Sequence, residues 1–372
     1  MILILTQSFP SRIGGIESLM FNLSLGLSKK KKVIIFADSH NILYDAIFDN
    51  QYKNKILTKR IGGIKFFRRR KKIRSIKLFI QSKKVKLVIG DSWKSLELGI
   101  DYLNENKIPS ICLAHGNELL SNKQYKKNRI IKTLNKVNSI VANSYFTSNL
   151  VKELIKSDTK LNVIHPGATD IRNLKHIKVP NIDGNPVLLT LARLEKRKGH
   201  ALIIKSIKKL QIKYPNIKYI IAGSGPELKN LKDIVKSESL ENSIIFVGSI
   251  NDYQKKYLFE KTNLMVMPTI DETHNQSIEG FGIAYLEAAF FSIPSIASNL
   301  GGTSEAVIDS VTGKIINNME DLYSSILELL NDQKKILELG KNAQNRVINE
   351  FNWEHITEKY LLLINNIILE SN

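Results

Sequence analysis

Short apolar runs alternate with amphipathic stretches along most of the 372-residue chain, and this alternation restricts the fold more than any other feature. In the first half, helical patterns such as Glu17–Leu27 and Ile73–Gln81 separate the apolar runs. The pattern restarts at Val187. Alternation of this kind predicts parallel sheets covered by helices on both faces. The predicted strands are Ile2–Leu5, Val33–Ala37, Ile64–Phe67, Leu87–Gly90, Ser110–Ala114, Ser139–Ala142, Val187–Leu191, Tyr219–Ala222, Ile244–Val247, Leu264–Met267 and Ser295–Ala297.

The restart divides the chain into two α/β domains. The stretch Gly167–Pro186 has no strong period and is typical of a linker. We therefore predict one doubly wound domain over 1–175 and a second over 176–352, facing each other across a cleft. Ligands of such domains bind at the carboxyl ends of the strands. Residues 353–372 form a last helix with a broad apolar face, and we expect it to pack back on the first domain.

Composition indicates a globular protein of a reducing compartment. Apolar residues make up 43% of the chain, and Cys112 is its single cysteine, which excludes an internal disulfide framework. The apolar run at Met1–Leu5 is too short for a signal peptide or a membrane span. We expect a cytoplasmic protein.

Positive charge is concentrated in the first half of the chain. Residues 1–175 contain 33 Lys and Arg against 12 Asp and Glu, a net charge of +21, whereas residues 176–372 contain 22 against 23, a net charge of −1. This asymmetry indicates an anionic partner: a membrane, a nucleic acid or a polyanionic substrate. The basic run Lys65–Arg74 places Phe66, Phe67 and Ile73 beside six cations between Arg68 and Arg74, which suits an anionic lipid surface. A solvated helix face is the alternative.

Two carboxylates, Glu279 and Glu287, stand eight positions apart in the second half. The apolar sequence after Ile283 predicts a helix, which places Glu279 on a loop at its start and Glu287 inside it. Free backbone N–H groups at a helix start suit anionic or hydroxyl-rich ligands, and the segment Gly280-Phe281-Gly282 supplies such groups. A buried Glu287 requires a polar partner.

Two other strand ends have groups that suit phosphate. Gly14 and Gly15 follow the first strand, where paired glycines let backbone N–H groups approach a phosphate; a plain turn is equally compatible. Arg193 and Lys198 follow the strand that starts at Val187, and together they form a candidate diphosphate clamp. A solvated basic loop is the alternative.

Further candidates follow other strands. Gly248 and Ile250 could lie against a flat base, and Asp252 either binds the base or caps the next helix. His115 could reach a sugar hydroxyl or the reacting centre, or serve a structural role. His274 precedes Glu279, and we expect it in solvent.

Several enzyme classes are excluded by missing motifs. No His, Cys, Asp or Glu cluster has the spacing of a metal site, and no Asp-x-Asp pair is present to hold a metal–diphosphate. The chain also has no G-x-S-x-G elbow and no G-x-x-x-x-G-K-[ST] loop, which removes serine hydrolases and P-loop enzymes.

In chain order these motifs resemble the retaining glycosyltransferases of family 4, which have the GT-B fold of two facing Rossmann-like domains. The sequence around Glu279 is most similar to that of the GDP-mannose-dependent, phosphatidylinositol mannosyltransferase-like members. The resemblance runs nearly end to end and rests on these segments: Gly14–Glu17, His115–Glu118, Asn143-Ser144, His165–Gly167, Leu191–Gly199, Ala222–Pro226, Phe246–Gly248, Glu279–Ala288, Gly301–Glu305 and Thr312-Gly313.

The resemblance implies a role for each candidate residue. Arg193 and Lys198 would bind the donor diphosphate, helped by Gly15 and the neighbouring Gly14. Glu287 would accept hydrogen bonds from the ribose. Glu279, with the backbone of Gly280, Phe281 and Gly282, would hold sugar hydroxyls. His115 would approach the transferred sugar, and Gly248, Ile250 and Asp252 would flank the base.

The implied reaction is retention at the anomeric carbon without a metal or other cofactor. Mannose from GDP-mannose is the first choice of donor and a UDP-hexose the second. The implied acceptor is lipid-linked, glycan or membrane-associated, reached from the inner face of the plasma membrane. The alternatives are a nucleic-acid-binding protein, which would leave the motifs of the neutral half unexplained, and an epimerase or phosphorylase of the same fold.

Overall fold

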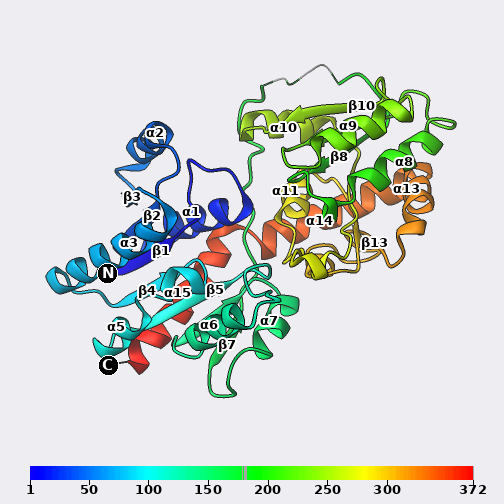
Figure 1. Cartoon of the computed structure of the whole chain (residues 1–372). Coiled ribbons are helices and arrows are strands. Elements are labelled where there is room, and N and C mark those ends of the chain that lie inside the picture. The colour runs from blue at the N-terminus through cyan, green and yellow to red at the C-terminus, as the bar shows by residue number, and fades with distance from the viewer. Residues whose placement is uncertain (178, 180–181, 372) are drawn as a thin grey trace. The chain divides into compact units, whose positions relative to one another are not determined.

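The computed structural model describes residues 1–177, 179 and 182–371. The chain forms two compact units (Figure 1): unit 1 comprises Met1–Gly167 with Trp353–Asn372, and unit 2 comprises Ala168–Asn352. The predicted linker Gly167–Pro186 includes residues 178, 180 and 181, which lie outside the described residues. Its described part forms no helix or strand.

Unit 1 is built on a seven-stranded sheet in the order β3-β2-β1-β4-β5-β6-β7, and all of its neighbouring strands are parallel. The central strands are buried along their whole length, as expected for a parallel sheet with both faces covered. The strands are β1 (Ile2–Thr6), β2 (Val33–Asp38), β3 (Leu57–Ile61), β4 (Leu87–Gly90), β5 (Ser110–Ala114), β6 (Ser139–Ala142) and β7 (Lys160–Val163).

Alternate residues of β1 fill two separate cores. Ile2 and Ile4 belong to the core that α1 and α15 cover, whereas Leu3 and Leu5 point to the opposite face. Helices therefore lie on both sides of this sheet, which makes it doubly wound. The helices of unit 1 are α1 (Gly15–Ser28), α2 (Ile42–Tyr52), α3 (Lys65–Ser82), α4 (Trp93–Leu96), α5 (Ile100–Glu105), α6 (Gln124–Leu134), α7 (Tyr145–Lys152) and α15 (Trp353–Glu370).

Unit 2 repeats this plan with a six-stranded parallel sheet in the order β10-β9-β8-β11-β12-β13. Its strands are β8 (Val187–Leu191), β9 (Lys218–Ala222), β10 (Ile244–Gly248), β11 (Leu264–Met267), β12 (Ser295–Ser298) and β13 (Gly313–Ile316). Its helices are η1 (Lys196–Lys198), α8 (His200–Leu210), α9 (Leu228–Ser237), α10 (Asp252–Lys261), η2 (Thr273–Asn275), α11 (Ile283–Ala289), α12 (Thr303–Ala306), η3 (Met319–Asp321), α13 (Leu322–Asn331) and α14 (Gln333–Glu350).

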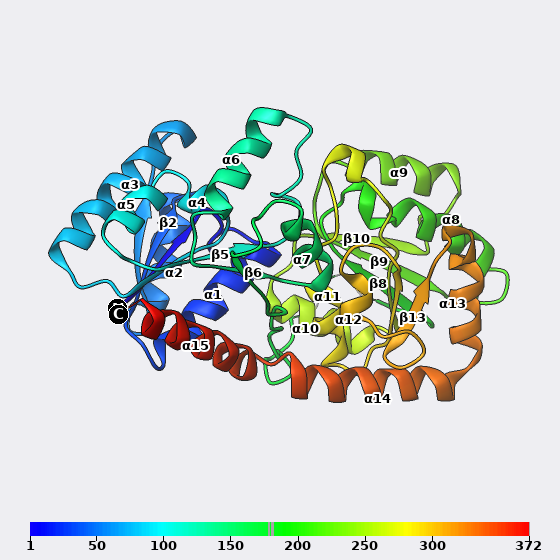
Figure 2. The same cartoon turned by 90° about the horizontal axis from the view of Figure 1, so that it is seen from below.

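The last helix, α15, packs along α1 in unit 1 (Figure 2). Its buried residues Ile356, Tyr360 and Ile364 join the core that contains Ile4 and Leu23. The chain thus leaves unit 2 after α14 and completes the core of unit 1 with its C-terminal helix.

The predicted fold class, two doubly wound Rossmann-like α/β sheets, is confirmed, but one strand was placed wrongly. Ile64–Phe67 is not a strand, because Ile64 precedes α3 and the edge strand of this sheet is β3. The residues of β3 alternate between exposed and half-buried positions and include Lys59 and Arg60, so they lack the apolar run used for the prediction. The strands β7 and β13 were not predicted.

The boundary between the units also falls earlier than the predicted 175/176. Ala168 and Ile171 are buried in the core of unit 2, and the N–H of Ala168 donates to the carbonyl of Phe351 at 2.9 Å. These contacts place the start of unit 2 directly after Gly167.

Candidate functional site

Glu279 lies on the loop between β11 and α11, and its carboxylate pairs with two cations from the segment after β8. Lys198 Nζ lies 2.5 Å from Glu279 Oε2, and Arg197 Nη1 contacts the same oxygen. All three side chains are at most 12% exposed. Since β8 and β11 are neighbours where the strand order reverses, this cluster occupies the carboxyl-end position where such sheets bind ligands.

Burial and charge act against each other in this cluster. Burial raises the pKa of the Glu279 carboxyl, but the charges of Lys198 and Arg197 outweigh it, so the pKa lies below its ordinary value. Burial lowers the pKa of the Lys198 ammonium although Glu279 opposes this shift. Two buried cations therefore share the Glu279 carboxylate, and Arg197 shares Glu195 with the exposed Arg193. This segment thus has three cations against two carboxylates, which favours an anionic ligand.

Arg193 does not join this cluster. Its side chain is 66% exposed, and its Nη1 pairs with Glu195 Oε1 at 3.0 Å. Arg197, which sequence reasoning did not select, takes the buried position and also pairs with Glu195 Oε2 at 2.9 Å. In the run Lys196-Arg197-Lys198, Arg197 and Lys198 are buried and Lys196 is exposed. Three adjacent cations look alike in sequence, so only the structure distinguishes them.

The Glu279 loop is supported from behind by Gly301 and Gly302. Gly302 N–H donates to the Glu279 carbonyl at 3.0 Å, and a Cβ on Gly301 would collide with that carbonyl. Gly301 also has a φ of +68°, which favours glycine. The glycine pair thus lets the chain after β12 approach the Glu279 backbone closely.

Gly280, Phe281 and Gly282 complete the turn into α11. The Phe281 ring is buried in the core, 5.9 Å from the ring of Phe351, so only its backbone remains for a ligand. Gly282 has a φ of +98° and immediately precedes the helix.

Glu287 has a protein partner that the sequence did not predict. Lys255 Nζ, from α10, lies 2.6 Å from Glu287 Oε1 and 2.9 Å from Asp252 Oδ1. Burial lowers the pKa of Lys255, but Glu287 and Asp252 outweigh it and raise the pKa above its ordinary value. The predicted cap at Asp252 was wrong: Asn251 is the N-cap and forms a capping box with Gln254, whereas Asp252 pairs with Lys255.

The ends of β9 and β10 are joined beside this pair. Gly223 N–H donates to the Gly248 carbonyl at 2.8 Å, and the hydroxyl groups of Ser224 and Ser249 lie 3.0 Å apart. Ile250 is half-buried and packs against the core of unit 2.

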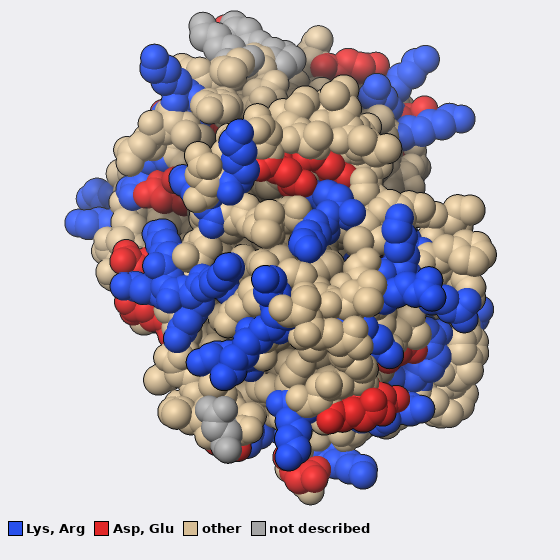
Figure 3. All heavy atoms as spheres, turned by 90° about the vertical axis from the view of Figure 1, so that its left-hand side faces the viewer, with Lys and Arg blue, Asp and Glu red and all other residues tan. Residues whose placement is uncertain are grey.

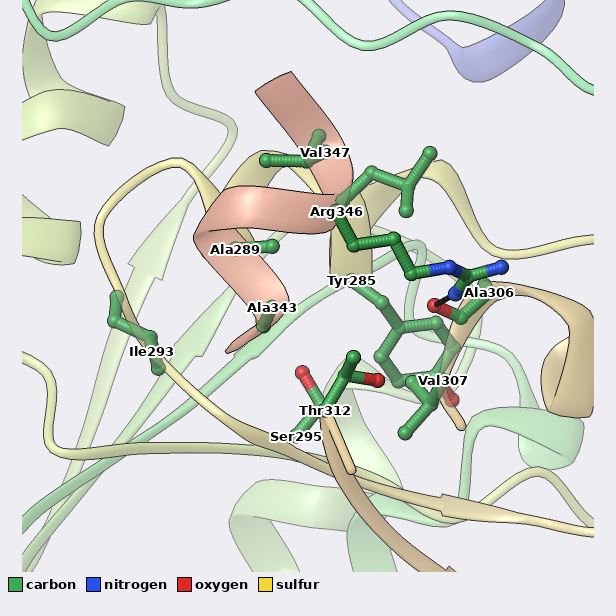
Figure 4. A pocket seen from close by; sticks show the side chains of 11 residues that line it. Tyr285, Ala289, Ile293, Ser295, Ala306, Val307, Thr312, Ala343, Arg346 and Val347 are labelled. Atoms are coloured by element: carbon green, nitrogen blue, oxygen red, sulfur yellow. Dashed lines mark hydrogen bonds between the residues drawn. The ribbon is translucent and has the colours of Figure 1, made fainter. Parts of the chain in front are cut away.

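Figure 4 shows a small pocket on the inner side of α11, beneath Tyr285. Arg346 reaches across it and donates to the carbonyl of Ala306 at 2.9 Å. Apolar side chains supply most of its lining, and neither Glu279, Lys198 nor Glu287 belongs to it. This pocket therefore belongs to the packing of α11 on α14.

In unit 1 the predicted residues also follow strand ends. Gly14 precedes α1 and Gly15 begins it. The buried carboxylate of Glu17 folds back onto Gly14, where any Cβ would collide with it, and pairs with Arg12 at 3.1 Å. The Glu17 carboxylate thus packs against the turn at Gly14, where only a glycine leaves room for it.

His115 is half-buried after β5 and is held at two points. Its backbone N–H donates to Glu118 Oε1 at 2.7 Å, and its ring Nε2 donates to the Asp91 carbonyl at 2.8 Å. The imidazole orientation is therefore fixed. His274 lies in η2 with a side chain that is 69% exposed, in agreement with its predicted place in solvent.

The sequence suggested that the whole basic run after Lys65 is a surface, but the structure exposes only part of it. Arg68 and Lys72 pair with Asp38, and Arg69 pairs with Glu97. The cations left exposed are Arg70, Lys71 and Arg74, together with Lys65. The run divides into inward ion pairs and an outward basic face because α3 turns one side towards the sheet.

Two features of membrane and metal proteins are absent from the described residues. No helix of this part of the chain has both the length and the apolar content needed to cross a bilayer. No group of three or more His, Cys, Asp or Glu side chains among these residues is arranged to hold a metal ion.

Comparison with known proteins places both halves of the chain in related families. The family described as Glycosyltransferase Family 4 matches residues 13–170, and the family described as Glycosyl transferases group 1 matches residues 172–346.

Named relatives match at low identity. A GDP-mannose-dependent alpha-(1-6)-phosphatidylinositol monomannoside mannosyltransferase of Mycolicibacterium smegmatis is 25% identical over 170 residues, which is 45% of this chain and 44% of that protein. The match thus spans less than half the length of that relative. An uncharacterised glycosyltransferase of Methanocaldococcus jannaschii is 29% identical over 92% of both chains.

Solved structures match over nearly the whole chain. Anabaena Alr3699/HepE in complex with UDP and glucose has a TM-score of 0.81 at 18% identity and covers 98% of this chain and 99% of that chain. Sucrose-phosphate synthase of Thermosynechococcus elongatus has a TM-score of 0.81 at 18% identity over 99% of each chain. With its two Rossmann-like sheets and both family matches, the chain belongs to the family 4 glycosyltransferases of the GT-B fold.

Proposed function

We propose that this protein transfers a hexose from a nucleotide sugar to an acceptor, with retention and an α-linkage. The observation that carries the proposal is the buried cluster in which Lys198 and Arg197 share Glu279 at the carboxyl ends of β8 and β11. A diphosphate arriving there would take up the excess positive charge, and the start of α11 would offer N–H groups to the sugar.

GDP-mannose is the donor we propose first. Its support is the mycobacterial relative, whose name states dependence on GDP-mannose. A UDP-hexose is the alternative, since the similar Anabaena structure is a complex with UDP and glucose. The two donors differ in the base, which would lie near Gly248 and Ile250.

In the proposed reaction, the bond from the anomeric carbon to the diphosphate breaks while the acceptor oxygen bonds to the same face. The acceptor proton passes to the departing phosphate oxygen. Lys198 and Arg193 stabilise the charge that develops on the diphosphate, with Arg197 behind them, so the reaction uses no bound metal. Glu279 positions the sugar hydroxyls, Glu287 the ribose, and His115 approaches the transferred sugar.

Nucleotide-dependent stability and turnover test this proposal. We expect the matching nucleoside diphosphate among GDP, UDP and ADP to raise the melting temperature most. Glu279→Ala and Lys198→Ala should each lower turnover of the matching nucleotide sugar by about a hundredfold or more. Lys196→Ala is the matched control, because Lys196 is the neighbouring lysine with a side chain that is 71% exposed.

Three outcomes would contradict the proposal. Unchanged turnover in both Glu279→Ala and Lys198→Ala would remove the assigned site. Loss of turnover on treatment with EDTA would remove the metal-independent reaction. Product analysis of the linkage by NMR would show an inverted anomeric carbon if the stereochemistry proposed here were wrong.

We also propose that unit 1 meets its acceptor on an anionic membrane surface, at the cytoplasmic side. Figure 3 shows the side of the molecule that includes α3, with Lys and Arg side chains spread over much of it. At the start of α3, Ile64, Phe66 and Phe67 are between 57% and 75% exposed beside the exposed Arg70 and Lys71. Apolar groups next to cations suit a lipid interface.

Co-sedimentation with anionic vesicles tests the membrane contact. Replacing Arg70, Lys71 and Arg74 by Gln should weaken binding by about a hundredfold, at roughly 1 kcal/mol for each of the three cations. Replacing Lys29, Lys30 and Lys31 by Gln removes the same charge from another exposed run of unit 1 and should have a smaller effect. Equal weakening would contradict a specific contact, and steeply salt-dependent binding to DNA without vesicle binding would favour a nucleic-acid partner instead.

A further inference from the structure

Unit 1 has its own crevice at the point where its strand order reverses. β1 has β2 on one side and β4 on the other, so the segments after β1 and β4 leave the sheet in a position where doubly wound domains bind ligands. A pocket opens there between Gln7, which follows β1, and Lys94 and Ser95 of the short helix α4 after β4. Arg69 and Lys72 of α3 line its other side.

Three cations converge on this pocket, and two of them are neutralised within unit 1. Arg69 Nη2 lies 2.6 Å from Glu97 Oε2 and also donates to the Lys94 carbonyl at 2.9 Å. Lys72 is 3% exposed, pairs with Asp38 and donates to the Thr6 carbonyl at 2.7 Å. Their positions are therefore fixed by the fold.

The third cation, Lys94, is half-buried and has no hydrogen bond or ion pair from its ammonium group to any described residue. Burial lowers its pKa, and so do the charges of Lys126, Lys65 and Arg69, with Glu118 acting in the opposite direction. The Glu118 carboxylate only partly offsets the charge of Lys94, since Glu118 Oε1 already accepts a hydrogen bond from the backbone N–H of His115.

The nearby buried carboxylate of Asp91 is also occupied. Its Oδ2 accepts from Thr6 Oγ1 at 2.7 Å and from the N–H of Gln7 at 2.7 Å, and its Oδ1 accepts from Ser95 Oγ at 2.6 Å. These bonds occupy the Asp91 carboxylate, so it does not pair with Lys94. The Lys94 ammonium lies 5.7 Å from the centroid of the Trp93 ring, a contact weaker than a buried ion pair. A partly desolvated ammonium among other cations is costly unless an anion joins it.

We propose that this pocket binds a phosphate group of the acceptor, with Lys94 as the principal contact and Arg69 and Lys72 beside it. A phosphate carries up to two negative charges and three oxygen acceptors, which suits one guanidinium and two ammonium groups that approach from different elements. The assignment to the acceptor rests on the proposed function, which places the donor on unit 2. The pocket thus makes a phosphate-bearing molecule the acceptor class.

Calorimetric titration of the full-length protein tests the proposal. The protein is first saturated with the nucleoside diphosphate that stabilises it most, and glycerol 3-phosphate and inorganic phosphate are then titrated separately. We expect saturable binding of glycerol 3-phosphate, weakened about tenfold or more by Lys94→Gln, because a hydrogen-bonded ion pair is lost. Lys83→Gln is the matched control: it removes one exposed cation at the end of α3, outside the pocket, and should change affinity less than about twofold.

Three results would overturn the proposal. The first is no saturable binding of glycerol 3-phosphate, and the second is equal weakening by Lys94→Gln and Lys83→Gln. The third is inorganic phosphate binding as tightly as the ester, which would make the pocket a site for the free anion. The nucleotide-induced rise in melting temperature reports unit 2 separately, so failure of this inference and failure of the proposed function give different results.

Discussion

At the scale of single residues, the candidate donor site is a set of buried charges that do not balance. Arg197 and Lys198 both contact Glu279. His200 follows two residues later, and among the described residues neither of its ring nitrogens has a hydrogen-bond partner. A neutral His200 adds no charge to this cluster, whereas a protonated one would add a third cation. The environment favours the neutral form: burial, followed by the charge of Lys198, lowers the pKa of His200 to about 4.

His200 should therefore make stability depend on pH. Its pKa rises from about 4 in the folded chain to the ordinary 6.5 in the unfolded chain, so between these values the unfolded chain binds the extra proton. The stabilisation is present above pH 6.5 and is lost as the pH falls towards 4, by about 3 kcal/mol in total. Denaturant unfolding of the wild type and of His200→Gln should show this part of the pH slope only in the wild type.

A second substitution at the same position supplies the control for this measurement. His200→Leu also removes the imidazole, so it should lose the same part of the slope as His200→Gln. Identical slopes for the wild type and His200→Gln would mean that His200 is protonated in the folded chain.

Arg193 and Arg197 should differ in what they contribute to stability, although both contact Glu195. Arg197→Ala removes a buried pairing with Glu279 and should lower the free energy of unfolding by about 2 kcal/mol. Arg193→Ala removes an exposed pair and should change it by less than about 0.5 kcal/mol. Urea unfolding of both variants measures the difference, and equal losses would contradict the burial that separates the two arginines.

Sequence reasoning reached some of these residues and missed others for physical reasons. Glu279 and Lys198 were predictable because both follow apolar strands, and strand ends of a parallel sheet meet at one edge. Arg197 was missed because neighbouring cations in one run differ only in the direction of their side chains. Lys255 was missed because its contact with Glu287 joins two helices, and local patterns do not report which helix faces pair.

At the scale of elements, the site depends on segments that bring backbone close to backbone. The chain after β12 passes beneath the Glu279 loop at Gly301 and Gly302, and Lys255 joins α10 to α11 through Glu287. Most strand positions were predictable from their apolar runs, and so was most of the helix order. The polar edge strand β3 was not, because an edge strand has one side in solvent and needs no apolar run.

Gly301→Ala should disturb the Glu279 loop as a whole. A Cβ at this position would meet the Glu279 carbonyl, and a φ of +68° adds backbone strain. We expect a loss of about 2 kcal/mol in the free energy of unfolding and a smaller nucleotide-induced rise in melting temperature. Thermal unfolding with and without the matching nucleoside diphosphate measures both effects.

Gly62 offers a comparison site, since its nearest neighbour would be Ser39 Cβ at 4.0 Å from the added Cβ. Gly62→Ala should leave nucleotide stabilisation at its wild-type value. A wild-type nucleotide response in Gly301→Ala would show that the loop does not need this close approach to hold the ligand.

At the scale of the whole molecule, the chain crosses from unit 1 to unit 2 and returns. The doubly wound plan of both units follows from the sequence, because buried parallel strands require apolar runs and the covering helices require amphipathic ones. The first crossing was harder to locate: Ala168 and Ile171 are only two apolar positions in an irregular segment, yet they are buried in the core of unit 2. The return was easier to see, because α15 has a broad apolar face.

Because α15 returns to unit 1, a substitution in this C-terminal helix should affect unit 1 and not unit 2. Ile364 of α15 is fully buried in the core that contains Ile4, so Ile364→Ala should lower the free energy of unfolding of unit 1 by about 3 kcal/mol. Leu362, on the same helix, is 66% exposed, and Leu362→Ala should cost less than about 0.5 kcal/mol. The nucleotide identifies the units in a calorimetric scan, because a ligand of unit 2 raises only the transition of the unit that binds it. Ile364→Ala should therefore lower the transition that the nucleotide leaves unmoved, and a loss confined to the nucleotide-sensitive transition would contradict the assignment of α15 to the core of unit 1.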